Sequence, residues 1–264
     1  MRIVRAVMIG DVVGEPGLEV LEAELPGLIK EHNVDFVTVN GENAAGGFGL
    51  TDACLQRILT AGADVVTSGN HVWEKRDFWP IMQTEKRMLR PANYSEGSPG
   101  SGWISIEKSG CRWIAVNLQG REFMSAIECP FRSFDKILDS SKMDDGVSGV
   151  KLVLVDFHAE SCREKEALAY YIDGRASLIA GTHTHVQTAD ERILPKGAGY
   201  ITDLGMTGNT TSVIGMDPDI CIARSRKQVL YRMECAGKGA KSEIQGIIAE
   251  IDADTGKAVS IRRI

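Results

Sequence analysis

Four of the five histidines in this chain follow apolar, strand-like runs, in three short segments, two of which also carry a carboxylate or an amide. Two further segments of this kind carry carboxylates without a histidine. The five segments are residues 9–11, 40–43, 68–71, 155–158 and 181–185. Because ligands bind outside the carboxyl ends of strands in an open α/β sheet, we expect these five strand ends to meet at one place.

The side chains in these segments are suited to binding metal ions. The candidate ligands are Asp11, Glu42, Asn43, Asn70, His158, His183 and His185. A nitrogen and oxygen set of this kind suits Mn, Fe or Zn. It exceeds the four ligands of a tetrahedral zinc ion, so we expect a two-metal centre with ions about 3.5–4 Å apart. Such a centre activates a bridging water and holds the phosphoryl oxygens during cleavage of a phosphoester.

A general acid must protonate the leaving oxygen in this chemistry. His71, which follows Asn70, is the candidate because imidazole can donate a proton near neutral pH. Asp156 precedes His158 by two residues, and we expect it to orient that histidine rather than to bind metal. His32 lies at a predicted helix end, where it interacts favourably with the helix dipole and has no further expected role.

Three other features have two interpretations each. The glycine-rich segment 46–49 could hold phosphate through its backbone amides or form a flexible loop at the rim of the site. Residues 203–206 could line the pocket or form a turn after a strand. Trp73 and Trp79 could stack on a base, but packing is the expected role of both.

The elements that position these side chains alternate through the first half of the chain. Apolar runs and helical spacing predict, in order, a strand over 2–9, a helix over 16–31, a strand over 35–40, a helix over 51–61 and a strand over 64–68. Thr51 is the expected N-cap of the second helix. The β-α-β-α-β order predicts a parallel sheet with right-handed crossovers.

The second half is less regular. The pattern predicts a hairpin over 102–117, a helix near 131–139, a strand over 151–157, a helix over 163–173, strands over 177–181 and 191–194, and strands over 243–251 and 258–263 that flank a turn. Residues 77–100 show no clear period. We expect one mixed sheet, partly parallel and partly built from hairpins, in a single domain that spans residues 1–264.

Composition excludes several classes of protein. The net charge is −6 and no long basic run is present, which argues against long nucleic acid as a partner. The six cysteines form no C-x-x-C pair and predict buried thiols in a reducing cytoplasm. No apolar run approaches membrane-spanning length, so we expect a cytoplasmic protein without a membrane partner. Exposed strand edges leave room for a homo-oligomer.

The order Asp11, Gly41-Glu42-Asn43, Gly69-Asn70-His71, His158 and Gly181–His185 resembles the calcineurin-like metallophosphoesterase superfamily. Two positions differ from the general pattern, which opens with Asp-x-His and bridges its metals with Gly-Asp. Both differences, together with the segments 40–47, 69–73, 179–187 and 200–208, resemble the bacterial branch of YmdB-like phosphodiesterases. The resemblance covers nearly the whole chain and is least clear over 85–150.

This resemblance implies an α/β fold, a mixed-sheet αββα sandwich. It implies that Asp11, Glu42, Asn43 and His185 hold one divalent ion, and that Glu42 bridges to a second ion held by Asn70, His158 and His183. Asn43 takes the place of the usual histidine, which favours Mn or Fe over Zn. The implied substrates are small cyclic nucleotides, 2′,3′ or 3′,5′. A broad phosphomonoesterase and a nucleotide-sensing regulatory protein remain alternatives.

Overall fold

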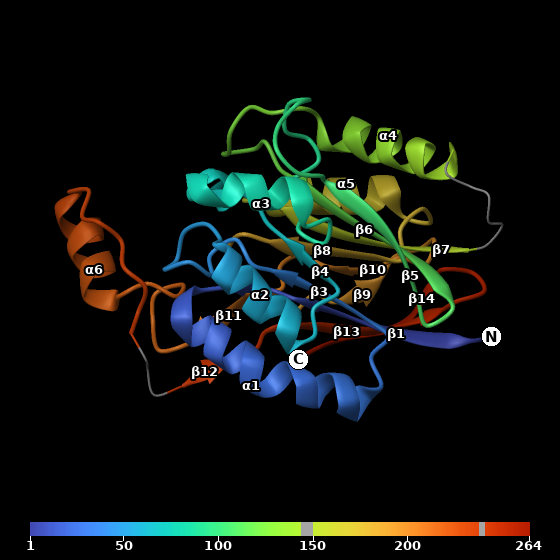
Figure 1. Cartoon of the computed structure of the whole chain (residues 1–264), viewed down its shortest axis with the longest axis horizontal. Coiled ribbons are helices and arrows are strands. Elements are labelled where there is room, and N and C mark those ends of the chain that lie inside the picture. The colour runs from blue at the N-terminus through green and yellow to red at the C-terminus, as the bar shows by residue number, and fades with distance from the viewer. Residues whose placement is uncertain (144–149, 238–240) are drawn as a thin grey trace.

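Two β-sheets lie face to face in the computed structural model, which describes residues 1–143, 150–237 and 241–264 (Figure 1). The first sheet has the strand order β14 (Ala258–Arg263), β13 (Gly246–Asp252), β1 (Ile3–Ile9), β3 (Phe36–Asn40) and β4 (Val65–Thr67). The second has the order β5 (Trp103–Lys108), β6 (Cys111–Gln119), β7 (Lys151–His158), β8 (Leu178–Thr182), β10 (Gly199–Ile201) and β9 (Arg192–Ile193). A small third sheet joins β12 (Ser242–Glu243), β11 (Met206–Asn209) and β2 (Asp11–Val12).

Helices cover the two outer faces. On the first sheet lie α1 (Gly14–His32) and α2 (Asp52–Ala61), and on the second lie α4 (Pro130–Met143) and α5 (Cys162–Ile172) (Figure 1). The short helices η1 (Asn70–Trp73), η2 (Arg76–Phe78) and α3 (Trp79–Thr84) follow β4, and α6 (Pro218–Lys227) stands away from the body (Figure 1). The predicted αββα sandwich with mixed sheets is therefore confirmed.

Each large sheet is buried on both faces, on one side against helices and on the other against the second sheet, and alternate residues of a strand point to these two sides. Along β1, Ala6 and Met8 face the second sheet, whereas Val7 and Ile9 face the helices. The sheets are joined by a central apolar core in which the rings of Phe36 and Trp113 stack with centroids 4.8 Å apart. Strands buried in this way carry continuous apolar runs, which is the pattern that made them recognisable in the sequence.

Parallel pairing brings the functional segments to one end of each sheet. Strands β1, β3 and β4 are parallel, and β6, β7, β8 and β10 are parallel. The two sets of carboxyl ends meet, because Asn40 Nδ2 at the end of β3 donates to Asp156 Oδ2 near the end of β7 at 3.0 Å. The expected convergence of strand ends thus holds across two sheets.

Several details of the prediction need correction. The residue pattern favoured one mixed sheet, but two large sheets form: β1, β3 and β4 pair with the last strands, β13 and β14, and β5 to β10 pair among themselves. Two sheets are stable because the apolar inner face of each is buried against the other. Residues 77–100 contain η2 and α3 rather than only irregular structure. Thr51 does cap α2, since its Oγ1 accepts from the Cys54 amide at 3.3 Å.

The cysteines were expected to be buried, and this was wrong. All six are free thiols, five are half-buried, and Cys162 is exposed at the start of α5. Within the described ranges, no helix is both long and apolar enough to cross a membrane.

Candidate metal centre

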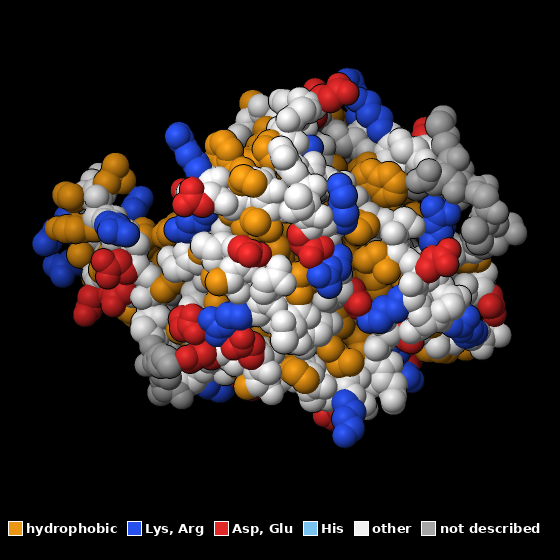
Figure 2. Space-filling model, viewed as in Figure 1, with side chains coloured by type: hydrophobic (Ala, Val, Ile, Leu, Met, Phe, Trp, Pro, Cys, Tyr) orange, Lys and Arg blue, Asp and Glu red, His pale blue; other side chains and the backbone are white. Residues whose placement is uncertain are grey.

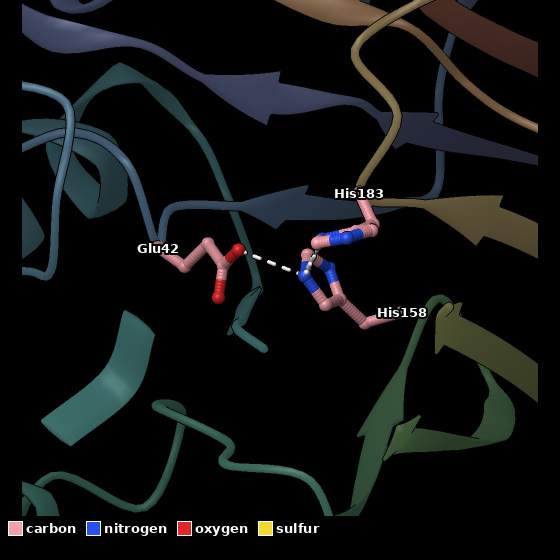
Figure 3. A group of neighbouring side chains, drawn as sticks. All are labelled: Glu42, His158 and His183. Atoms are coloured by element: carbon pink, nitrogen blue, oxygen red, sulfur yellow. Dashed lines mark hydrogen bonds and ion pairs between the residues drawn. The ribbon is translucent and has the colours of Figure 1, made fainter. Parts of the chain in front are cut away.

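The buried imidazole of His158 lies at the centre of the candidate site. Three atoms of metal-ligating type surround its Nε2: Glu42 Oε1 at 2.8 Å, Asn70 Oδ1 at 3.1 Å and His183 Nδ1 at 3.0 Å. Figure 3 shows Glu42, His158 and His183 pointing toward one another from three different strand ends. Donor atoms of this kind, gathered from separate segments around one point, fit the coordination of a divalent ion.

Two buried oxygens beside this group have no hydrogen-bond partner among the described residues. They are Asp11 Oδ1 and Asn43 Oδ1. The orientation of the Asn43 amide is fixed because its Nδ2 donates to the Gly47 carbonyl at 2.8 Å. Asp11 Oδ1 lies 4.0 Å from His185 Nε2. Because an unsatisfied buried acceptor costs about 1–3 kcal/mol, these oxygens fit a second cation beside the first.

Each of the three histidines has its other ring nitrogen held by a hydrogen-bond partner. His158 Nδ1 lies 2.9 Å from Thr182 Oγ1, whose hydroxyl donates to Asp156 at 2.6 Å. The supporting role expected for Asp156 is therefore exerted through Thr182. Asp156 also accepts from the Thr67 hydroxyl and from the Asn40 amide, so it is held from both sheets.

The other two histidines are held in the same manner by groups that the sequence did not point to. His183 Nε2 lies 3.1 Å from Glu160 Oε2, and His185 Nδ1 lies 2.9 Å from the carbonyl of Ile214. Partners of this kind fix the tautomer and the ring orientation of a ligand. They leave Nδ1 of His183 directed at His158 Nε2 and Nε2 of His185 directed at Asp11 Oδ1, as ligands of divalent ions would be.

Burial and mutual charge perturb the titration of these groups. Burial raises the pKa of Asp11 to about 6, even though His185 and His158 favour its ionised form. Burial also opposes ionisation of Glu42, but the charge and hydrogen bond of His158 outweigh it and lower the pKa of Glu42 to about 2. For His158, burial opposes the charged form, and Glu42 and Asp11 outweigh it to raise the pKa to about 9. Burial and the charge of His158 lower the pKa of His183 to about 3.

A glycine permits the closest approach in the site. A Cβ on Gly69 would lie 2.1 Å from the His158 ring, so only glycine lets the end of β4 pass beside that imidazole. This contact explains why Gly69 precedes Asn70, whose amide reaches His158 Nε2.

His71 lies beside the ligand group rather than within it. Its backbone amide donates to Glu42 Oε2 at 3.1 Å, and its Nδ1 lies 3.3 Å from Glu74 Oε1. The ring meets Phe48 edge to face with centroids 5.0 Å apart. His71 therefore has Nε2 available to a bound substrate.

A cavity of about 840 Å³ opens beside these groups. Its lining includes Glu42, Asn43, His71, His183 and His185. Gly46 and Phe48 also line it, so the glycine-rich loop lies at the site, whereas Asp203 is buried beneath it.

The two candidate tryptophans do not line this cavity. Trp73 packs edge to face against Trp79, with centroids 6.1 Å apart, and Trp79 Nε1 donates to the Trp73 carbonyl. Packing, the expected role of both, accounts for them.

Comparison with known proteins identifies the family. Residues 7–264 match the family model described as YmdB-like protein. The chain belongs to the YmdB-like family. It is 41% identical over 260 residues to the 2′,3′-cyclic-nucleotide 2′-phosphodiesterase of Bacillus subtilis, covering 98% of this chain and 96% of that protein.

Two solved structures of comparable length resemble this YmdB-like chain. A hypothetical protein from Thermus thermophilus has a TM-score of 0.89 and 37% identity, with 98% of both chains covered. A phosphatase from Mycoplasma pneumoniae has a TM-score of 0.89 and 32% identity, covering 100% of this chain and 93% of that one. The recognition made on the sequence motifs is thus confirmed.

The close approach at Gly69 yields a first prediction. Gly69→Ala should lower the free energy of unfolding by about 1–3 kcal/mol and weaken metal binding, because the added methyl displaces the His158 ring. Gly27→Ala is the matched control, since its Cβ meets nothing within 4 Å in α1 and should stabilise by about 0.5–1 kcal/mol. Urea unfolding and metal titration measure both effects. Wild-type stability and metal affinity in Gly69→Ala would contradict the packing argument.

The raised pKa of His158 yields a second prediction, for protein stripped of metal. Its folded pKa of about 9 exceeds the unfolded value of about 6.5, so its stabilisation is complete below about pH 6.5 and is lost as the pH rises toward 9. Between pH 7 and pH 9 the wild type should lose more unfolding free energy than His158→Gln does, as measured by urea titration with a chelator present. Parallel losses in the two proteins would refute this assignment.

Proposed function

We propose that this protein is a metal-dependent phosphodiesterase that hydrolyses 2′,3′-cyclic nucleotides. The observation that carries the proposal is the convergence of Glu42, Asn70 and His183 on His158 Nε2, next to the unpartnered oxygens of Asp11 and Asn43. The activity named for the Bacillus subtilis relative, which matches along the whole chain, supports the choice of substrate.

The proposed ligand sets correspond to the atoms around His158 Nε2 and to the unpartnered oxygens of Asp11 and Asn43. Asp11, Glu42, Asn43 and His185 would hold one divalent ion, and Glu42, Asn70, His158 and His183 would hold the other, with Glu42 shared. When bound, the pair would acidify a water molecule and balance charge on the phosphoryl oxygens. The oxygen-rich sets favour Mn or Fe over Zn.

His71 is proposed as the general acid. Water adds to phosphorus, the bond from phosphorus to O2′ breaks, and the Nε2 proton of His71 passes to the departing O2′. The product is a nucleoside 3′-monophosphate with a free 2′-hydroxyl. Glu74, 3.3 Å from His71 Nδ1, holds the ring in the orientation that this step needs.

Two other functions would use the same site. A phosphomonoesterase would prefer the monoester product over the cyclic diester, and a nucleotide sensor would bind without turnover. The presence of both a candidate general acid and a candidate site for two metal ions favours catalysis, because a nucleotide sensor needs neither. A 3′,5′-cyclic nucleotide activity, a cytoplasmic location and a homo-oligomeric state remain predictions from the sequence.

The central prediction concerns substrate and metal together. Mn-loaded protein should hydrolyse 2′,3′-cyclic AMP to the 3′-monophosphate faster than it hydrolyses 3′,5′-cyclic AMP or the monoester product. His158→Ala and Asn70→Ala should each lose metal, measured by mass spectrometry of the intact protein, and turnover, measured by product chromatography. Faster hydrolysis of the monoester would favour the phosphomonoesterase, and tight binding without turnover in fully metal-loaded protein would favour the sensor.

The role of His71 has its own test. His71→Ala should retain both ions but lose about 10²- to 10⁴-fold in kcat on 2′,3′-cyclic AMP, because the ribose oxygen leaves poorly without a proton. The loss should be much smaller on bis(4-nitrophenyl) phosphate, whose leaving group needs no protonation. His32→Ala, at the end of α1, is the control. Equal losses on both substrates would rule out the acid assignment.

A further inference from the structure

Residues 214–233 form an excursion, here termed the arm, that leaves the body and returns to the same place. Its two ends are joined, because Met216 forms a bridge with Cys235 and the Asp217 amide donates to the Glu234 carbonyl at 2.9 Å. Between these ends lies α6, which projects from one end of the molecule (Figure 1). The arm is thus anchored only at its base.

Packing against the rest of this chain contributes little to α6, which is capped by Asp217 and contacts the core through the half-buried Cys221. None of its ten residues is buried, and an isolated helix of this length is marginal in water. The arm instead carries apolar and basic side chains to the surface (Figure 2), among them Leu230, which is 83% exposed. Exposed apolar side chains gathered in this way are typical of a binding surface.

The inner side of the arm faces the candidate centre. Arg224, Tyr231 and Arg232 line the same cavity as His71 and His183. The backbone of Tyr231 is fixed, since its carbonyl accepts from Arg224 Nη1 at 3.2 Å and its amide donates to the Val229 carbonyl at 2.9 Å. Tyr231 is 37% exposed, and Lys227 Nζ lies over its ring, 5.8 Å from the centroid, which adds a third cation near the place where we expect the ligand.

A second ring and two free cations line the cavity. Phe48 packs against Val13, Met206 and Met216 at the base of the arm, so its position is fixed by the core. Among the described residues, neither Lys75 nor Arg232 has an ion pair or a side-chain hydrogen bond, although both line the cavity. Aromatic faces and unpaired cations together match a ligand that is both aromatic and anionic.

We propose that the arm is the nucleoside-recognition element of this site, with Tyr231 as the residue on which the base stacks. Phe48 forms the fixed apolar wall, and Lys75 and Arg232 attract the anionic phosphodiester. A cavity of about 840 Å³ accommodates a nucleoside beyond the phosphate. The proposal rests on the proposed phosphodiesterase function and makes Tyr231 a specificity-determining residue for it.

The test compares a substrate that has a base with one that lacks it. 2′,3′-cyclic AMP and glycerol 1,2-cyclic phosphate share the five-membered cyclic diester, but only the former has a base. Stacking on an aromatic side chain contributes about 1–3 kcal/mol per base, so Tyr231→Ala should lower the ratio of kcat/KM for these substrates by about tenfold or more, chiefly through KM. Tyr231→Phe should restore the ratio, and Leu230→Ala, the exposed neighbour, should keep it.

Each outcome decides the proposal. An unchanged ratio in Tyr231→Ala, or equal losses on both substrates, would overturn it, since equal losses indicate a structural defect. If the wild type hydrolyses neither diester, the proposed function fails, and calorimetric binding of adenosine 3′-monophosphate to metal-free protein tests the arm separately. Weaker binding in Tyr231→Ala, restored in Tyr231→Phe, would support base recognition, and equal binding in all three proteins would refute it.

Discussion

The burial of His158 among carboxylates is the constraint on which the rest of the structure depends. Burying a charge is costly unless an opposite charge and hydrogen bonds compensate it. Glu42 and Asp11 supply the charge, and Thr182 supplies the hydrogen bond, with Asp156 behind it. Because these residues come from both sheets, the sandwich must close tightly for the compensation to exist, so packing of the core and formation of the site are coupled.

A second buried pair holds the loop after β8. Lys165 Nζ lies 2.7 Å from Asp203 Oδ2, and the same carboxylate oxygen accepts from the Thr184 amide at 3.2 Å. This support is needed because His183 and His185 both have positive φ, 100° and 63°, which is unfavourable for residues other than glycine. A strained backbone conformation of this kind is maintained only where several surrounding interactions hold it in place. Here the Lys165–Asp203 ion pair and the contacts of the two histidines with His158 and Ile214 hold the backbone in place.

The strand ends and their polar residues could be predicted from the sequence because each follows a continuous apolar run, as at Asp11 and His158. Supporting groups could not be predicted, since a threonine such as Thr182 or an exposed acid such as Glu160 has no distinctive spacing. The contact made by Ile214 could not be predicted either, because it uses a backbone carbonyl, which every residue has. The arm was missed for a related reason: α6 buries nothing, so its residues lack the apolar period by which helices are recognised.

Ile214 links the arm to the candidate centre. It is β-branched yet has a φ of 50°, a conformation that such residues rarely adopt, and its carbonyl is the acceptor at His185 Nδ1. The side chain does not explain this conformation, because it is 46% exposed. The turn does, since Ile214 and Gly215 (φ of 88°) are the two central residues between the bridged pair Val213 and Met216, and a two-residue turn of this kind requires positive φ at both. The segment that carries Tyr231 is therefore joined to His185 at one strained residue, so the base recognition and the metal binding that we propose would depend on a single structural unit.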